Sequence, residues 1–96
     1  MIKVLIVDDN ELSRDMLRES LQNEADIDIA ATASDGMDAV LKIEKLRPDI
    51  VLADLVMPRL DGIGLVKKIK DEMANEAPSF IMISRVTGTL YDRGRN

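Results

Sequence analysis

The sequence is 96 residues long, which allows one small domain, and its 46% hydrophobic and 32% charged residues are typical of a globular protein. It contains no cysteine and no histidine, which excludes a disulfide framework, thiolate metal sites and histidine-based catalysis. The net charge of −5 argues against nucleic-acid binding by this domain. Because no signal peptide and no run of transmembrane length occurs, we expect no membrane contact and a cytoplasmic location.

The first part of the chain predicts a strand followed by a helix. Residues 3–7 form a short apolar run ended by Asp8, which is typical of a buried strand. Residues 11–24 predict a helix with four apolar side chains on one stripe, namely Leu12, Met16, Leu17 and Leu21.

The same pattern then repeats. Residues 26–33 alternate apolar with polar or small residues and predict a second strand. The following helix has Ser34 or Asp35 as its cap and ends at Pro48. Its predicted apolar side consists of Ala39, Val40, Ile43 and Leu46.

The last predicted elements are a strand over residues 49–54, a helix over 61–76 and a fourth strand over 79–84. The inward side of that helix is predicted to carry Ile63, Val66, Ile69 and Met73. Strands that are apolar throughout and alternate with amphipathic helices indicate an α/β fold with a parallel sheet covered on both faces.

Polar side chains end three of these strands. Asp8 and Asp9 follow the first strand, Asp54 ends the third and Ser84 ends the fourth. In open α/β sheets, ligands bind outside the carboxyl ends of the strands. We therefore expect these four residues to meet at one edge of the sheet.

Three acidic residues at one edge repel one another unless they share protons or hold a cation. An all-oxygen ligand set of this kind suits Mg²⁺, which commonly completes its coordination with phosphate oxygens. Asp54 is then a candidate nucleophile for a phosphoryl group, and the Ser84 hydroxyl could donate a hydrogen bond to that group. The alternative for Asp8 is that it only caps the following helix.

Four motifs resemble the receiver domain of two-component response regulators. They are "LIVDDN" with the paired acids Asp8 and Asp9, "DIVLAD" ending on Asp54, the following "MP" and "DG", and "IMIS" ending on Ser84. The resemblance covers residues 2 to about 84. It implies a CheY-like, flavodoxin-like doubly wound sheet, whose full strand order is 2-1-3-4-5.

The resemblance also implies roles for single residues. The phosphoacceptor falls on Asp54, and the Mg²⁺ ligands fall on Asp9, Asp54 and the carbonyl of Val56, with Asp8 holding metal-bound water. The switch hydroxyl falls on Ser84. Four further residues match positions around the site: Pro58 and Gly62 in the loop that shapes it, and Asn10 and Arg59 at its flanks, where ordinary loop residues are the alternative reading.

The chain departs from the family after Ser84. The last twelve residues, "RVTGTLYDRGRN", contain no lysine that could contact the phosphoryl group, and their net charge of +2 leaves −7 on residues 1–84. We expect residues 1–84 to form the receiver core, of strand order 2-1-3-4 without the fifth strand and helix, and residues 85–96 to be a remnant tail. Arg85 stands where the family has a small residue, so it is either exposed or a substitute phosphate contact.

The departures also predict association. Without a fifth strand, residues 80–84 would form an unpaired edge strand and apolar surface would lie open beside the first helix. We expect a homodimer, formed by covering this surface or by strand exchange, unless "VTGTLY" folds back as a strand.

The implied function is a signalling domain rather than an enzyme. A sensor histidine kinase would phosphorylate Asp54 in a Mg²⁺-dependent step, and the domain would control an output domain, commonly DNA-binding, of a longer protein. The alternative is a pseudo-receiver that acts as an interaction module without phosphorylation. A hydrolase or a dinucleotide-binding oxidoreductase is disfavoured, because the acids after the first strand do not alternate and no glycine-rich turn follows it.

Overall fold

The computed structural model describes residues 1–54, 62–84 and 89–90, and for Asp54, Ser84, Thr89 and Leu90 it describes the backbone alone. The described elements are β1 (Ile2–Val7), α1 (Glu11–Gln22), β2 (Ile27–Ala33), α2 (Gly36–Leu46), β3 (Ile50–Asp54), α3 (Gly62–Met73), the 3₁₀ turn η1 (Ala74–Glu76), β4 (Ser79–Ser84) and β5 (Thr89–Leu90). In this part of the chain, no helix is long and apolar enough to cross a membrane.

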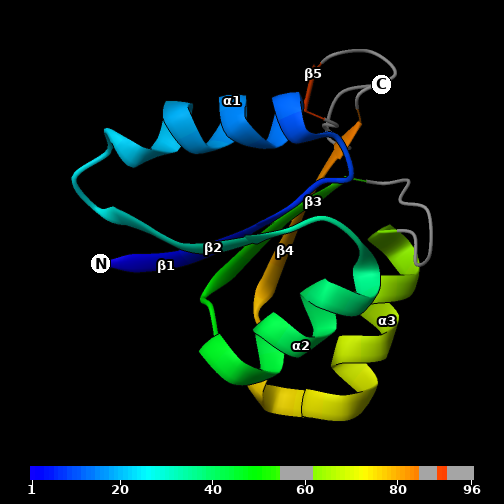
Figure 1. The fold of residues 1–96 in the computed structure, drawn as a ribbon. Coiled ribbons are helices and arrows are strands. Elements are labelled where there is room, and N and C mark those ends of the chain that lie inside the picture. The colour runs from blue at the N-terminus through cyan, green and yellow to red at the C-terminus, as the bar shows by residue number, and fades with distance from the viewer. Residues whose placement is uncertain (55–61, 85–88, 91–96) are drawn as a thin grey trace.

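The sheet has the strand order β2-β1-β3-β4-β5, and its first four strands are parallel. Helix α1 lies on one face of the sheet, whereas α2 and α3 lie on the other (Figure 1). The predicted doubly wound α/β fold with the order 2-1-3-4 is therefore confirmed.

Strand β5 is an addition to that prediction. It runs antiparallel to β4 and pairs Leu90 with Ile83 and Thr89 with Ser84. The tail thus folds back as a strand, as one of the two alternatives proposed, but only over two residues. Among the described residues, the first four positions of β4, Ser79–Met82, have no strand on their outer side.

The larger part of the core lies between the sheet and the helices α2 and α3. Its buried members are Leu5, Val7, Ala33, Ala39, Val40, Ile43, Val51, Ala53, Leu65 and Ile69. Because side chains alternate along a strand, Val4 and Ile6 point to the other face, where they are also buried. Each large aliphatic side chain contributes about 1.5–3 kcal/mol by leaving water.

Side-chain caps fix where α1 and α2 begin. The Asn10 side chain accepts a hydrogen bond from the Ser13 amide at 2.9 Å, and the Asp35 side chain accepts one from the Asp38 amide at 2.9 Å. Asp35, rather than Ser34, is therefore the cap of α2. That helix ends at Leu46 and is capped by Arg47, whose φ of 52° is left-handed, directly before Pro48.

The inward side predicted for α3 is partly wrong. Ile63 is 70% exposed, whereas Leu65 and Ile69 are fully buried. Leu65 and Ile69 are four residues apart and share one face, and Ile63 precedes Leu65 by about 200° of helical rotation, so it points away. Val66 and Met73 are half-buried.

Helix α1 buries none of its residues completely. Leu12 and Met16 of its apolar stripe are 70% and 60% exposed, and Leu17 and Leu21 are half-buried. The stripe predicted from the sequence exists, but only its Leu17 and Leu21 side packs against the sheet. An apolar strip of α1 therefore stays open among the described residues.

Candidate functional site

Strand register brings the ends of β1, β3 and β4 together. Val7 of β1 pairs with Ala53 of β3, and Ala53 pairs with Met82 of β4. The next position on each strand is Asp8, Asp54 and Ile83, and Ser84 follows one residue later. Because neighbouring strands lie about 4.8 Å apart, Asp8 and Asp54 leave the sheet side by side.

Asp8 is buried at this edge. It is 2% exposed and is the one buried charged residue in the part of the chain that the structure describes. Its Oδ1 atom accepts a hydrogen bond from the backbone amide of Asn10 at 3.0 Å. A carboxylate in such a place is costly unless hydrogen bonds or a cation compensate its charge, which makes Asp8 a candidate for function.

The backbone of Asp8 is held on both sides. Its amide donates to the carbonyl of Ala33 at 3.0 Å, and its carbonyl accepts from Nη1 of Arg14 at 2.8 Å. Asn10 provides the cap of α1, so the alternative that Asp8 only caps this helix does not hold. The N-terminus of α1, with its positive partial charge, therefore begins beside the buried acid.

The structure describes some of the other predicted site residues and not others. Asp9 is exposed, and Gly62 is buried as the first residue of α3. For Asp54 and Ser84 the backbone position at the strand ends is described. Val56, Pro58, Arg59 and Arg85 lie outside the described residues, so the roles predicted for them stay predictions.

The donor chemistry at this edge fits a magnesium ion. Carboxylate oxygens, which Asp8, Asp9 and Asp54 would supply, are the ligand type that a hard divalent cation prefers. Because Asp8 is buried, a bound cation would also neutralise a negative charge that is costly at this position. Among the described side chains, which do not include that of Asp54, no group of three acidic, histidine or cysteine residues is placed to hold a metal. The complete ligand set therefore stays a prediction.

A family model described as the response regulator receiver domain matches residues 4–93 of this chain. The chain belongs to the response regulator receiver family. The match extends beyond residue 84, where the resemblance of single motifs ended, and includes the segment of β5.

Relatives and solved structures agree with this assignment. The chain is 43% identical over 86 residues to the protein-glutamate methylesterase/protein-glutamine glutaminase of Hydrogenovibrio crunogenus, covering 90% of this chain and 22% of that protein. It is 43% identical over 72 residues to the transcriptional regulatory protein BtsR of Escherichia coli, covering 75% of this chain and 30% of that protein.

A solved receiver has the same fold. The response regulator domain of CheB from Thermotoga maritima superposes with a TM-score of 0.80 at 36% identity, covering 93% of this chain and 66% of that one. Across the first seven methylesterase relatives, this receiver spans only 22–25% of the full length. Their catalytic activities are thus properties of longer proteins.

Sequence reasoning missed one residue that shapes the site. Arg14 reaches back from the first turn of α1 to the carbonyl of Asp8, and it is half-buried there. Because Arg14 lies off the apolar stripe of this helix, the sequence pattern assigns it no role. The available signal was its spacing, because Arg14 follows the Asn10 cap by four residues and so lies on the side of α1 that faces the strand end.

Proposed function

We propose that this receiver accepts a phosphoryl group on Asp54 from a phosphohistidine of a sensor kinase. The observation that supports the proposal most is the register, which ends β3 at Asp54 directly beside the buried Asp8 of β1. A buried acid next to the acceptor position favours cation binding, because a cation would offset the repulsion between the two carboxylates when the site is not phosphorylated. Membership of the receiver family supplies the substrate class.

In the proposed transfer, a carboxylate oxygen of Asp54 attacks phosphorus and forms an acyl phosphate. The P–N bond of the phosphohistidine breaks, and the imidazole nitrogen keeps the electron pair. With a small donor such as acetyl phosphate, the P–O bond to acetate breaks instead. No oxidant or further reactant is needed.

Asp8, Asp9, Asp54 and the carbonyl of Val56 would hold Mg²⁺ in this proposal, with Asp8 acting through bound water. When bound, Mg²⁺ neutralises the negative charge on the transferred oxygens. This chain's own contribution is the fixed position of Asp8, because hydrogen bonds at its amide, carbonyl and Oδ1 all restrain it.

Ser84 is the proposed switch residue. Its hydroxyl would donate a hydrogen bond to the phosphoryl group, and its backbone is paired with Thr89 of β5. A shift of Ser84 toward Asp54 would therefore pull on β5. In the same proposal, Pro58 and Gly62 shape the loop beside the site, and Arg59 and Arg85 affect phosphate access.

The test uses the chain with Mg²⁺ and acetyl phosphate, followed by intact mass spectrometry. We expect the mass of one phosphoryl group to be added to the wild type and to be absent from Asp54→Asn. Asp8→Asn should slow the reaction. Asp15→Asn, which removes an acid on α1 away from the strand ends, is the matched control and should react like the wild type.

Nuclear magnetic resonance with beryllium fluoride then tests the switch. Shifts at the Thr89 amide upon addition of Mg²⁺ and beryllium fluoride support it, provided that Asp54→Asn abolishes them. Phosphorylation of Asp54→Asn to the same extent as the wild type would refute the assignment of the acceptor.

Within a full-length regulator, we propose that this receiver acts in the cytoplasm on an output domain, as the small covered share of its relatives suggests. Residues 1–84 would carry the receiver core. The competing function is an interaction module that works without phosphorylation, and the exposed apolar residues of α1 favour it. If the chain incorporates no phosphoryl group yet associates with partners, that second function is the correct one.

A further inference from the structure

The turn between β1 and α1, residues 8–10, carries two adjacent acids whose shared peptide group is held from outside the turn. Nη1 of Arg14 donates a hydrogen bond to the carbonyl of Asp8 at 2.8 Å, across six positions of the chain. This carbonyl belongs to the peptide group that joins Asp8 to Asp9. Because a peptide group is planar, fixing its oxygen also fixes the direction of the Asp9 amide. The Arg14 guanidinium therefore restrains the backbone of both acids.

Arg14 also holds the turn at a second point, because its backbone amide donates to the carbonyl of Asn10 at 2.9 Å. The Asn10 amide in turn donates to Oδ1 of Asp8 at 3.0 Å, and the Asp8 amide donates to the carbonyl of Ala33 in β2 at 3.0 Å. Among these contacts, that of the Arg14 guanidinium can be removed by a substitution outside the turn. Its contribution is therefore open to a direct test that leaves both acids in place.

The two arginines of α1 lie in different surroundings. Arg14 is half-buried against the strand end, whereas Arg18, one turn later, is exposed and is paired with Asp15 at 3.2 Å. Hydrogen bonds from an ionised donor are roughly twice as strong as those between neutral groups. The contact of Arg14 with the Asp8 carbonyl should therefore hold the turn firmly, while the exposed pair of Arg18 contributes little.

We propose that Arg14 is a positioning residue of the site where β1 and β3 end, and that its hydrogen bond to the Asp8 carbonyl holds Asp8 and Asp9 where they can share one cation. This inference rests on the metal site of the proposed function and adds a residue to it. Replacing a residue that orients a metal ligand commonly lowers metal affinity by roughly 10–100-fold. We therefore expect Arg14→Met to weaken Mg²⁺ binding by about tenfold.

The direction of the change in affinity separates positioning from charge. Arg14 places a positive charge beside a cation site, so removing that charge alone would strengthen Mg²⁺ binding. Loss of the hydrogen bond to Asp8 would weaken it. Arg14→Lys keeps both the charge and a donor for the one hydrogen bond that the structure gives to the Asp8 carbonyl, so it should restore most of the affinity.

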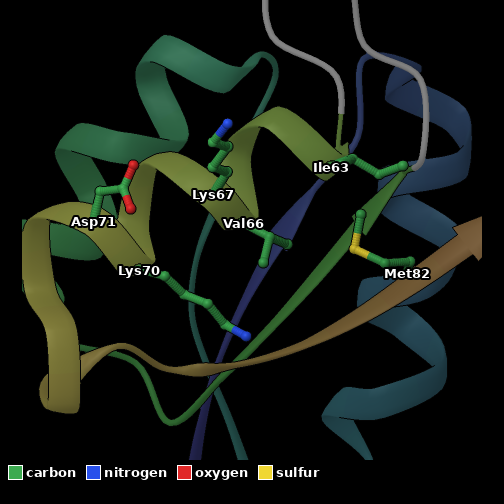
Figure 2. Close-up of a pocket in the computed structure, with 6 residues that line it drawn as sticks. All are labelled: Ile63, Val66, Lys67, Lys70, Asp71 and Met82. Carbon is green, nitrogen blue, oxygen red and sulfur yellow. The ribbon is translucent and has the colours of Figure 1, made fainter.

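The experiment is a Mg²⁺ titration of the chain, followed by nuclear magnetic resonance at the amides of Asp9 and Asn10. Two matched controls remove the same charge elsewhere. Arg18→Met removes it one turn further along α1. Lys70→Met removes it from the last turn of α3, on the other face of the sheet, where Figure 2 shows Lys70 reaching toward β4. Both controls should bind Mg²⁺ no more weakly than the wild type.

Hydrogen exchange of the metal-free protein gives a second readout. The Asn10 amide donates to Oδ1 of Asp8, so its exchange should be several-fold faster in Arg14→Met than in the wild type. The Asp38 amide, which donates to Oδ1 of Asp35 at the cap of α2, is the internal reference and should exchange at the same rate in both. Circular dichroism checks that each variant is folded under these conditions.

Unchanged or tighter Mg²⁺ binding by Arg14→Met would overturn the proposal. So would an Arg18→Met variant that binds as weakly as Arg14→Met, or an Arg14→Lys variant that binds no better than it. If the wild type binds no Mg²⁺ or Asp54 accepts no phosphoryl group, the proposed function fails. In that case the exchange rate of the Asn10 amide still decides whether Arg14 holds the turn, and an unchanged rate would refute it.

Discussion

The backbone amide of Asn10 donates a hydrogen bond to Oδ1 of Asp8 at 3.0 Å, while the side chain of Asn10 caps the helix that follows. One residue thus orients the buried acid and starts α1. The orientation of a candidate metal ligand and the stability of a helix are therefore coupled at this position.

Asn10→Ala should lower the free energy of unfolding by about 0.5–2 kcal/mol, because the Ser13 amide loses its acceptor. Asp35→Ala, at the cap of α2, should cost a similar amount and serves as the matched control. Both values come from urea denaturation followed by circular dichroism. Asn10→Ala should also weaken Mg²⁺ binding, because the backbone amide of Asn10 holds Oδ1 of Asp8 at 3.0 Å.

Asp8→Asn should remove the stabilisation that Mg²⁺ gives. A ligand that binds only the folded state raises the free energy of unfolding by RT ln(1 + [L]/Kd), so the wild type should melt higher as Mg²⁺ is added. The amide side chain of the variant still accepts from Asn10 but carries no charge. A variant that gains as much from Mg²⁺ as the wild type would exclude Asp8 from the metal site.

Two positions on α3 test where that helix packs. Leu65→Ala should destabilise the fold by about 2–5 kcal/mol, because Leu65 is fully buried and a cavity would remain. Ile63→Ala, two residues earlier and 70% exposed, should change stability by less than about 0.5 kcal/mol. Equal losses at both positions would mean that Ile63 is buried in solution, for example by a partner.

Glu44 of α2 makes stability depend on pH. A hydrogen bond with Glu72 of α3 and burial raise the pKa of Glu44, and the negative charge of Glu72 adds to the effect. The ionised form of Glu44 therefore destabilises the folded state relative to the unfolded state. This loss of stability develops as the pH rises from the ordinary pKa of 4.5 through the raised pKa of the folded state. Glu44→Gln should then be more stable than the wild type at pH 7, and the difference should vanish below pH 4.5.

The neighbouring groups act in the opposite direction. A hydrogen bond from Lys68 lowers the pKa of Glu72, so the stability from this pair is present above 4.5 and is lost as pH falls through the lowered folded pKa. Lys68→Met should remove that part of the pH dependence. Thermal melting of both variants between pH 3 and 8 checks the two effects, with Glu19→Gln on α1 as the control.

The parallel sheet could be predicted from the sequence, because apolar strands alternate with amphipathic helices, and the meeting of the strand ends followed because these strands end on Asp8, Asp54 and Ser84. The order of the strands came from the resemblance to the receiver family and not from the residue pattern. The prediction for α3 was wrong at Ile63, because the sequence of this helix contains two apolar stripes. Their spacing alone does not show whether Ile63 or Leu65 faces the core. Whether Leu12 and Met16 are buried depends on which element packs over α1, and the apolar pattern of α1 alone does not give that information.

Strand β5 was only one of two alternatives because a two-residue strand has almost no signal in the sequence. The choice between Ser34 and Asp35 as the cap was likewise open, since both residue types cap helices well. Arg14 was missed because its contact is with a backbone carbonyl, and a carbonyl has no residue-specific pattern.

The shortness of β5 determines which amides of β4 are open to solvent exchange. The Ser79 amide donates to the carbonyl of Asp49, so in a parallel strand the amides of Ile81 and Ile83 point the same way, toward β3, and those of Phe80 and Met82 point outward. Deuterium should therefore enter Phe80 and Met82 much faster than their neighbours in sequence. Slow exchange at these two amides would reveal a further strand on this edge of the sheet.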